Sequence, residues 1–310
     1  MDPNLVQWKI HGQSFLQRLR LWMNLLDPSL LLASDAEILK AHALLGSRAK
    51  PADKDDAALS LSLSSFHADS GAALPLAFRP PAFLPMSGLL VLGTLLPHGG
   101  VKPALFWQFL LQSYNAGFSY ANRNASAEQG KAVFSGQLAL MVGTVSCTTL
   151  AGALPQIIIN RLGITSGKLQ TFFRYMVPMP LSAALAFFCV FTVRSQEKET
   201  GIQVYDYTGK PVGVSKAAGE KAVRETALSR AALLGATAAV PNFLILLLPR
   251  RVFRGLVAPL RSVSATLVLG LMIPVSFSLF PPLGTVEKGS VEAELQARAV
   301  GSRLFYHRGL

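Results

Sequence analysis

Residues 231–249 read AALLGATAAVPNFLILLLP, nineteen positions without a single Asp, Glu, Lys or Arg. About 20 apolar residues cross the hydrocarbon core of a bilayer as one helix. A soluble fold needs charge on its surface, so many such segments in one chain predict an all-α, multi-pass helical membrane protein. Five further charge-free windows lie in the same chain, at 82–101, 103–122, 132–160, 175–193 and 262–286.

Charged residues are scarce and unevenly distributed. The 310 residues include 29 Lys and Arg and 17 Asp and Glu, a charged share of 15%, against about a quarter in ordinary soluble domains. Of the net charge of +12, all but one unit lies within residues 82–286, in the segments that join the apolar windows. This distribution fits anchoring at an anionic membrane surface, whereas a nucleic-acid-binding protein gathers its positive charge on one soluble face. We therefore expect membrane lipid as a partner and exclude nucleic acid.

The windows predict five or six transmembrane helices. Pro85 and Pro97 interrupt the first window, so its helix is expected to be short. The second window carries five polar residues on one helical face, because their spacings are 4, 3, 4 and 3. Three interpretations of this polar stripe are open: it lines a polar pathway, it hydrogen-bonds to neighbouring helices, or its helix lies in the membrane surface. The stripe consists of Gln108, Gln112, Asn115, Ser119 and Asn122.

Outside the apolar windows the sequence predicts three regions. Residues 1–81 form a small, helical, extramembrane N-terminal region, with helices expected near 14–26, 34–45 and 56–66. The transmembrane domain is 82–286, and its long loop at 194–230 is expected to contain a hairpin and then a helix. This loop is either a solvated connection or a docking surface for a partner. Residues 287–310 are a C-terminal tail.

Orientation follows from two loops that carry basic residues without acidic ones. Two spans separate these loops, so they lie on the same side of the membrane, which is the more negative compartment by the positive-inside rule. The C-terminal tail then faces the opposite side. The basic residues are Arg161, Lys168 and Arg174 in one loop and Arg250, Arg251, Arg254 and Arg261 in the other.

No catalytic, cofactor or metal site is expected, and the protein is predicted not to be an enzyme. The two cysteines, Cys147 and Cys189, both lie in apolar windows, so they predict neither a disulfide framework nor a metal site. The stretch 163–169 only partly resembles a phosphate-binding loop, since it lacks the first glycine and the final Ser or Thr.

Several stretches of this sequence resemble the sideroflexin family, over nearly the whole chain. The most specific block is QSYNA at 112–116 followed by YANR at 120–123, and GIQV at 201–204 matches the family's long loop. HADS at 67–70 resembles the family's His-Pro-Asp-Thr motif with two changes, which makes His67, Asp69 and Ser70 candidate functional residues. RPPAFLP at 79–85 is most similar to the family's fourth paralogue.

The resemblance implies a multi-pass protein of the mitochondrial inner membrane. It implies that other members carry serine and related small amino acids, and that the fourth paralogue is associated with assembly of respiratory complex I, mitochondrial respiration and iron homeostasis. We therefore expect an assembly factor whose partners are complex I assembly intermediates and other assembly factors. The alternative is a carrier of serine or a related small neutral amino acid, held by the polar stripe. His67 and Asp69 either fix a loop at the membrane surface or contact a substrate.

Overall fold

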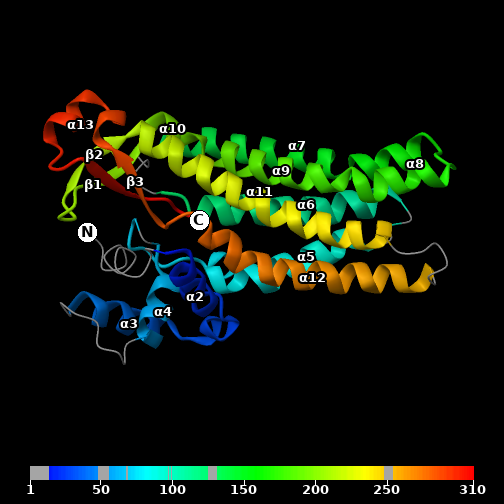
Figure 1. Ribbon diagram of the computed structural model, residues 1–310, viewed down its shortest axis with the longest axis horizontal. Coiled ribbons are helices and arrows are strands. Elements are labelled where there is room, and N and C mark those ends of the chain that lie inside the picture. The colour runs from blue at the N-terminus through cyan, green and yellow to red at the C-terminus, as the bar shows by residue number, and fades with distance from the viewer. Residues whose placement is uncertain are drawn as a thin grey trace.

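The computed structural model describes residues 14–47, 56–67, 69–96, 98, 100–124, 131–247 and 254–310. Within these residues, a long bundle of helices carries a mixed helical and β layer at one end (Figure 1). Parts of two sequence predictions, the polar loop before residue 56 and the arginines at 250 and 251, lie outside the described residues.

The bundle is built from six long or apolar helical segments. Helix α11 packs against α9 and α12, α6 packs against α7 and α9, and α5 lies against both α6 and α12. Helix α9 is preceded by α8 (Gly167–Thr171) and one π-helical turn, η5 (Phe172–Met176). The six bundle helices are α5 (Phe83–Leu95), α6 (Val101–Ala121), α7 (Lys131–Arg161), α9 (Pro178–Val193), α11 (Lys216–Leu247) and α12 (Arg254–Ser278).

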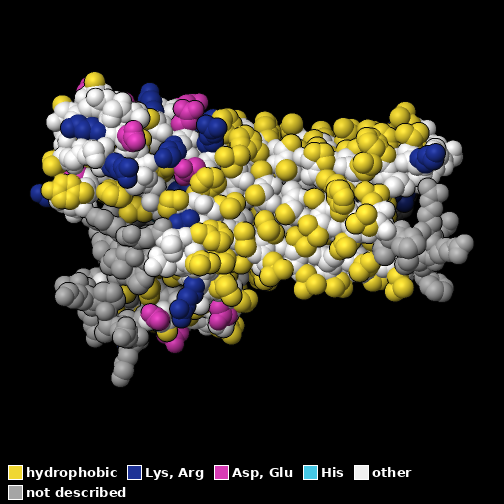
Figure 2. All heavy atoms as spheres, in the orientation of Figure 1, with side chains coloured by type: hydrophobic (Ala, Val, Ile, Leu, Met, Phe, Trp, Pro, Cys, Tyr) yellow, Lys and Arg dark blue, Asp and Glu magenta, His cyan; other side chains and the backbone are white. Residues whose placement is uncertain are grey.

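In the described part of the chain, four helices are long and apolar enough to cross a membrane: Gly136–Arg161, Gly167–Val193, Lys216–Leu247 and Gly255–Ser278. The multi-pass helical character is therefore confirmed, whereas the predicted count of five or six spans is not. The other two bundle helices are not among these four. The helical run that contains α5 is apolar but shorter, and the polar stripe lowers the hydropathy of α6. On the face shown in Figure 2, hydrophobic side chains cover the bundle, and most of the charged side chains lie at the end that carries the β layer.

Three helices form the N-terminal region beside that end of the bundle. Helix α2 (Phe15–Leu25) begins at a capping box in which Ser14 and Gln17 each bond the other's backbone. Trp22 and Leu25 of α2 are buried in the main core, and α2 packs against α12 and α4. The remaining helical elements here are η1 (Pro28–Leu32), α3 (Asp35–Ser47), α4 (Asp56–Ser65), η2 (Leu76–Phe78) and η3 (Pro80–Ala82).

A four-stranded antiparallel sheet, in the order β2-β1-β4-β3, covers the same end of the bundle. The long loop supplies α10 (Ser195–Thr200), β1 (Ile202–Tyr205) and β2 (Pro211–Ser215). The C-terminal tail supplies η6 (Lys288–Ser290), α13 (Ala293–Arg298) and β4 (Arg303–His307). Strand β3 (Leu283–Glu287) pairs with β4 in five registered pairs, and β4 pairs with β1 through Val204 and Tyr306.

The sheet corrects the prediction of an all-α fold. Apolar side chains on one face of its strands pack onto the start of α11, where Ala218 and Ala222 are fully buried. This contact explains the strands in physical terms, because a C-terminal segment with alternating buried side chains completes a sheet begun 100 residues earlier. The long loop and the tail therefore form one structural unit.

Candidate functional site

A cavity of about 570 Å³ lies among the bundle helices. It is lined by all six of them and by the π-helical turn η5, which contributes Phe173, Arg174 and Tyr175. Two prolines, Pro155 in α7 and Pro178 at the start of α9, also line it. This volume lies in the range of small-molecule sites.

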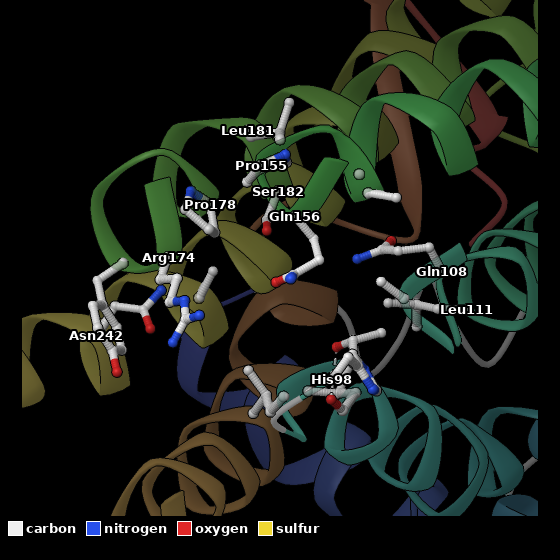
Figure 3. Close-up of a pocket in the computed structure, with 18 of the residues that line it drawn as sticks. His98, Gln108, Leu111, Pro155, Gln156, Arg174, Pro178, Leu181, Ser182 and Asn242 are labelled. Carbon is white, nitrogen blue, oxygen red and sulfur yellow. Dashed lines mark hydrogen bonds between the residues drawn. The ribbon is translucent and has the colours of Figure 1, made fainter. Parts of the chain in front are cut away.

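The lining of the cavity is cationic and rich in amides. Arg174 and Asn242 lie on one side, Gln108 on the other, and Gln156 between them (Figure 3). Arg261 donates from Nε to Oδ1 of Asn242 at 3.0 Å, and its guanidinium lies 5.3 Å from the centre of the Tyr175 ring. Among the described lining residues there is no Asp or Glu, so the cavity suits neutral polar or negatively charged groups.

Helix α6 presents the predicted polar stripe to the interior of the bundle. Gln108 and Gln112 line the large cavity, and Nε2 of Gln112 donates to Oε1 of Gln108 at 3.4 Å. Gly152 of α7 leaves room for the Gln108 side chain, since a Cβ atom at residue 152 would overlap it. On the opposite face of α6, Phe106 and Phe109 are exposed.

The rest of the stripe has different surroundings. Asn115 and Ser119 line a second, much smaller cavity between α6, α9 and α11. Asn122 donates from Nδ2 to the carbonyl oxygens of Phe78 and Phe118, both at 3.0 Å, so it caps α6 and ties it to η2. The stripe thus divides into a cavity part and a structural part, and its role in transport stays a prediction.

The motif residue His67 joins the N-terminal region to the end of α6. Its Nδ1 accepts from the backbone N–H groups of Asp69, at 3.3 Å, and Ser70, at 3.2 Å. Its Nε2 lies 2.5 Å from the carbonyl oxygen of Arg123, so a neutral imidazole protonated on Nε2 satisfies all three contacts. Burial lowers the pKa of His67, which favours this neutral form. Of the two roles left open, this geometry favours fixing a loop.

A network around Arg194 holds the β layer to the bundle. The Arg194 guanidinium donates twice to Glu197, at 2.5 and 2.7 Å, and once to the Arg308 carbonyl oxygen, at 2.7 Å. It also donates to Oγ1 of Thr226 in α11, at 3.1 Å. Asn124, just beyond α6, donates to Glu197 at 2.8 Å. One ion pair therefore connects α6, α10, α11 and the segment after β4.

Sequence reasoning did not find Arg194, Arg261 and Asn242 as site residues. The arginines border the charge-free windows, where they are expected to be anchors in water or headgroups, and Asn242 lies inside a window. A signal was present in the sequence, since a polar side chain inside a charge-free window, such as the Asn242 amide, often faces the interior of a helical bundle.

Long apolar helices packed around a polar cavity are typical of a multi-pass helical membrane protein. This chain belongs to the sideroflexin family, because the family model for sideroflexins matches residues 3–310. The resemblance seen in the sequence is thereby confirmed.

The chain is similar over its full length to curated members of that family. It is 51% identical to Sideroflexin-4 of Danio rerio, with 100% of both chains covered. It is 33% identical to Sideroflexin-4 of Homo sapiens, with 100% of this chain and 93% of the relative covered. It is 31% identical to Sideroflexin-5 of Caenorhabditis elegans, with 96% of this chain and 92% of the relative covered. No solved structure matches the chain.

Proposed function

We propose that this protein is an assembly factor for respiratory complex I in the mitochondrial inner membrane, and that it thereby supports mitochondrial respiration and iron homeostasis. The observation that carries the proposal is the 51% identity to a Sideroflexin-4 over the full length of both chains, together with the role that the fourth-paralogue resemblance implies. The altered motif at residues 67–70 also supports a role other than transport.

The extramembrane layer supports a scaffolding role. The Arg194–Glu197 pair and the sheet fix this layer rigidly to the bundle. It also exposes large apolar side chains at Leu32, Tyr207 and Val300, which are the positions where we propose that partner proteins pack. The partners proposed for this surface are complex I assembly intermediates and other assembly factors.

The second candidate function is a carrier of serine or a related small neutral amino acid. The cavity favours it, because Gln108, Gln112 and Gln156 offer amide groups between the bundle helices, and carriers hold substrates between membrane helices. The two arginines of the cavity match a carboxylate. Among the described residues of the lining there is no acidic side chain for the ammonium group, so the carrier remains second to the scaffold.

One experiment separates the two functions. Deleting the protein is expected to lower the amount of assembled complex I while leaving serine uptake by isolated mitochondria unchanged. Re-expression of the Gln112→Leu variant is expected to restore complex I, because the change alters the cavity and leaves the extramembrane layer intact. The matched control is Phe109→Leu, on the exposed face of the same helix.

The opposite pattern would favour the carrier. Loss of serine uptake on deletion, restored by Phe109→Leu but not by Gln112→Leu, would identify the cavity as a transport site and remove the support for a scaffold. Assembled complex I is measured on native gels, and insertion of each variant is checked by resistance to alkaline carbonate extraction.

A further inference from the structure

The small cavity beside the polar stripe contains two unused hydrogen-bond donors. It has a volume of about 10 Å³, which corresponds to space for about one water-sized particle. Nη1 of Arg230 and Nδ2 of Asn115 are both buried, and neither has a hydrogen-bond partner among the described residues. Both groups are donors, so they match an occupant that accepts hydrogen bonds.

The charge of Arg230 also lacks compensation. Its side chain is only 6% exposed, and a guanidinium does not lose its proton in proteins. Within the described residues Arg230 forms no ion pair, and Arg194 and Arg308 act on it as like charges. Glu197 is already paired with Arg194. A buried, unpaired cation in a membrane-spanning helix is costly and marks a functional position.

Three aromatic rings surround the guanidinium and supply part of the compensation. Its central carbon lies 4.8 Å from the centre of the Phe83 ring, 5.0 Å from that of Phe118 and 4.3 Å from that of Phe277. Neutral rings attract a cation through their quadrupole, but they carry no net charge and accept no conventional hydrogen bond from Nη1. The rings therefore explain where Arg230 lies without satisfying its charge.

We propose that the small cavity binds one monovalent anion of halide size, held by Nη1 of Arg230 and Nδ2 of Asn115. The small volume and the apolar neighbours Ala186, Val190 and Leu234 exclude larger polyatomic anions. Leu234 lines both cavities, so the small cavity lies beside the large one. The anion neutralises Arg230 and fixes α6 against α11. This site is independent of the assembly role.

The test measures whether halide ions stabilise the full-length protein. The purified protein in lipid nanodiscs is melted in chloride, bromide or gluconate at one constant ionic strength, so that general screening is the same. Because a ligand that binds only the folded state raises stability with its concentration, we expect the melting temperature to be several degrees higher in chloride and bromide than in gluconate. This difference is expected to disappear in Arg230→Met and in Asn115→Leu.

The control and the contrary outcomes are defined by the same measurement. Arg224→Met removes an exposed arginine from the same helix and is expected to keep the halide effect. Equal melting temperatures in all three salts, or a halide effect that survives Asn115→Leu, overturns the proposal, and this second variant decides if Arg230→Met does not fold. In crystals soaked in bromide, anomalous scattering at the cavity supports the site, whereas a water molecule there without bromide overturns it.

Discussion

Glu197 is the residue on which the junction between membrane and β layer depends most. It is 1% exposed and accepts two bonds from Arg194 and one from Asn124. In Glu197→Gln the shape is kept, but the Arg194 charge is left buried without an opposite charge. Breaking a buried pair in this way costs about 3–5 kcal/mol, so we expect a large fall in melting temperature in detergent or nanodiscs.

The matched control lies two residues further along the same helix. Glu199→Gln removes an exposed carboxylate, and exposed ion pairs contribute about 0–1 kcal/mol. A fall in melting temperature of similar size in both variants would show that α10 is sensitive to any loss of negative charge, and the special role of the buried pair would be wrong.

His307 makes the stability of this junction depend on pH. Burial lowers the pKa of His307 to about 3, whereas an unfolded histidine has a pKa of about 6.5. Between these values the unfolded chain binds a proton that the folded chain does not. Stability is therefore complete above about pH 6.5 and is lost as the pH falls, by at most about 1.4 kcal/mol per pH unit for this one group.

We expect the melting temperature to fall between pH 7 and pH 5, and to fall less steeply in His307→Asn. Nδ1 of His307 accepts from the backbone N–H of Gly309 at 3.3 Å, and the Asn amide oxygen can replace that acceptor. Part of the pH dependence that remains in His307→Asn comes from His67, because burial also lowers the pKa of His67. Identical pH slopes in the two proteins would contradict the assignment to His307.

At the scale of elements, the closest approach that supports the junction is between α10 and α11. A Cβ atom on Gly219 would overlap the Glu197 carbonyl oxygen, which belongs to the backbone and cannot move aside alone. Gly219→Ala is therefore expected to separate the two helices, at the cost of about 1–3 kcal/mol that overpacking typically brings. A thermal melt of the variant measures this loss.

Gly270 provides the comparison, because a Cβ atom there meets nothing within 4 Å. Gly270→Ala also lies in a helix, where alanine is favoured over glycine by up to about 1 kcal/mol, so its melting temperature is expected to be unchanged or higher. If both substitutions destabilise equally, flexibility of the helix backbone and not the α10–α11 contact is the cause.

The bundle helices were predictable because each depends on local sequence. A window without charge marks a segment surrounded by hydrocarbon, and the spacing of Gln108, Gln112 and Asn115 marks one face of α6 before any contact is known. The C-terminal strands were not predictable in this way. The pairing of Val204 with Tyr306 joins residues about 100 positions apart, and short strands leave little periodic signal.

The candidate sites show the same limit. Arg230 directly precedes the charge-free window at 231–249, so a positional pattern places it at the membrane surface. The structure buries it under Phe83, Phe118 and Phe277, which come from three other parts of the chain. Burial of a charge is a tertiary property, and no spacing rule within one helix contains it.

At the scale of the whole molecule, both ends of the bundle are defined. The β layer and the N-terminal helices lie at one end, and α8 lies at the other (Figure 1). We therefore expect cysteines introduced at Lys168 and at Glu294, both exposed, to react with a membrane-impermeant maleimide from opposite sides of the membrane. Asp35→Cys is expected to react from the side of Glu294→Cys.

The same measurement decides how the hairpin of α5 and α6 relates to the four apolar helices. His98, in the α5–α6 turn, lines the same cavity as Arg174, Val257 and Arg261, which lie towards the end of the bundle remote from the sheet. The helical run Pro80–Leu95 covers about 24 Å at 1.5 Å per residue, and the turn adds further length towards the roughly 30 Å of a hydrocarbon core.

We therefore expect Lys102→Cys to react from the side of Lys168→Cys, which would make α5 and α6 two further crossings. The protein without added cysteines is the control, since Cys189 is buried and Cys147 lies within a span that the reagent does not enter. Reaction of Lys102→Cys from the side of Glu294→Cys would instead make the hairpin of α5 and α6 a re-entrant element, because a turn that never reaches the far surface cannot be labelled there. The protein would then have four spans.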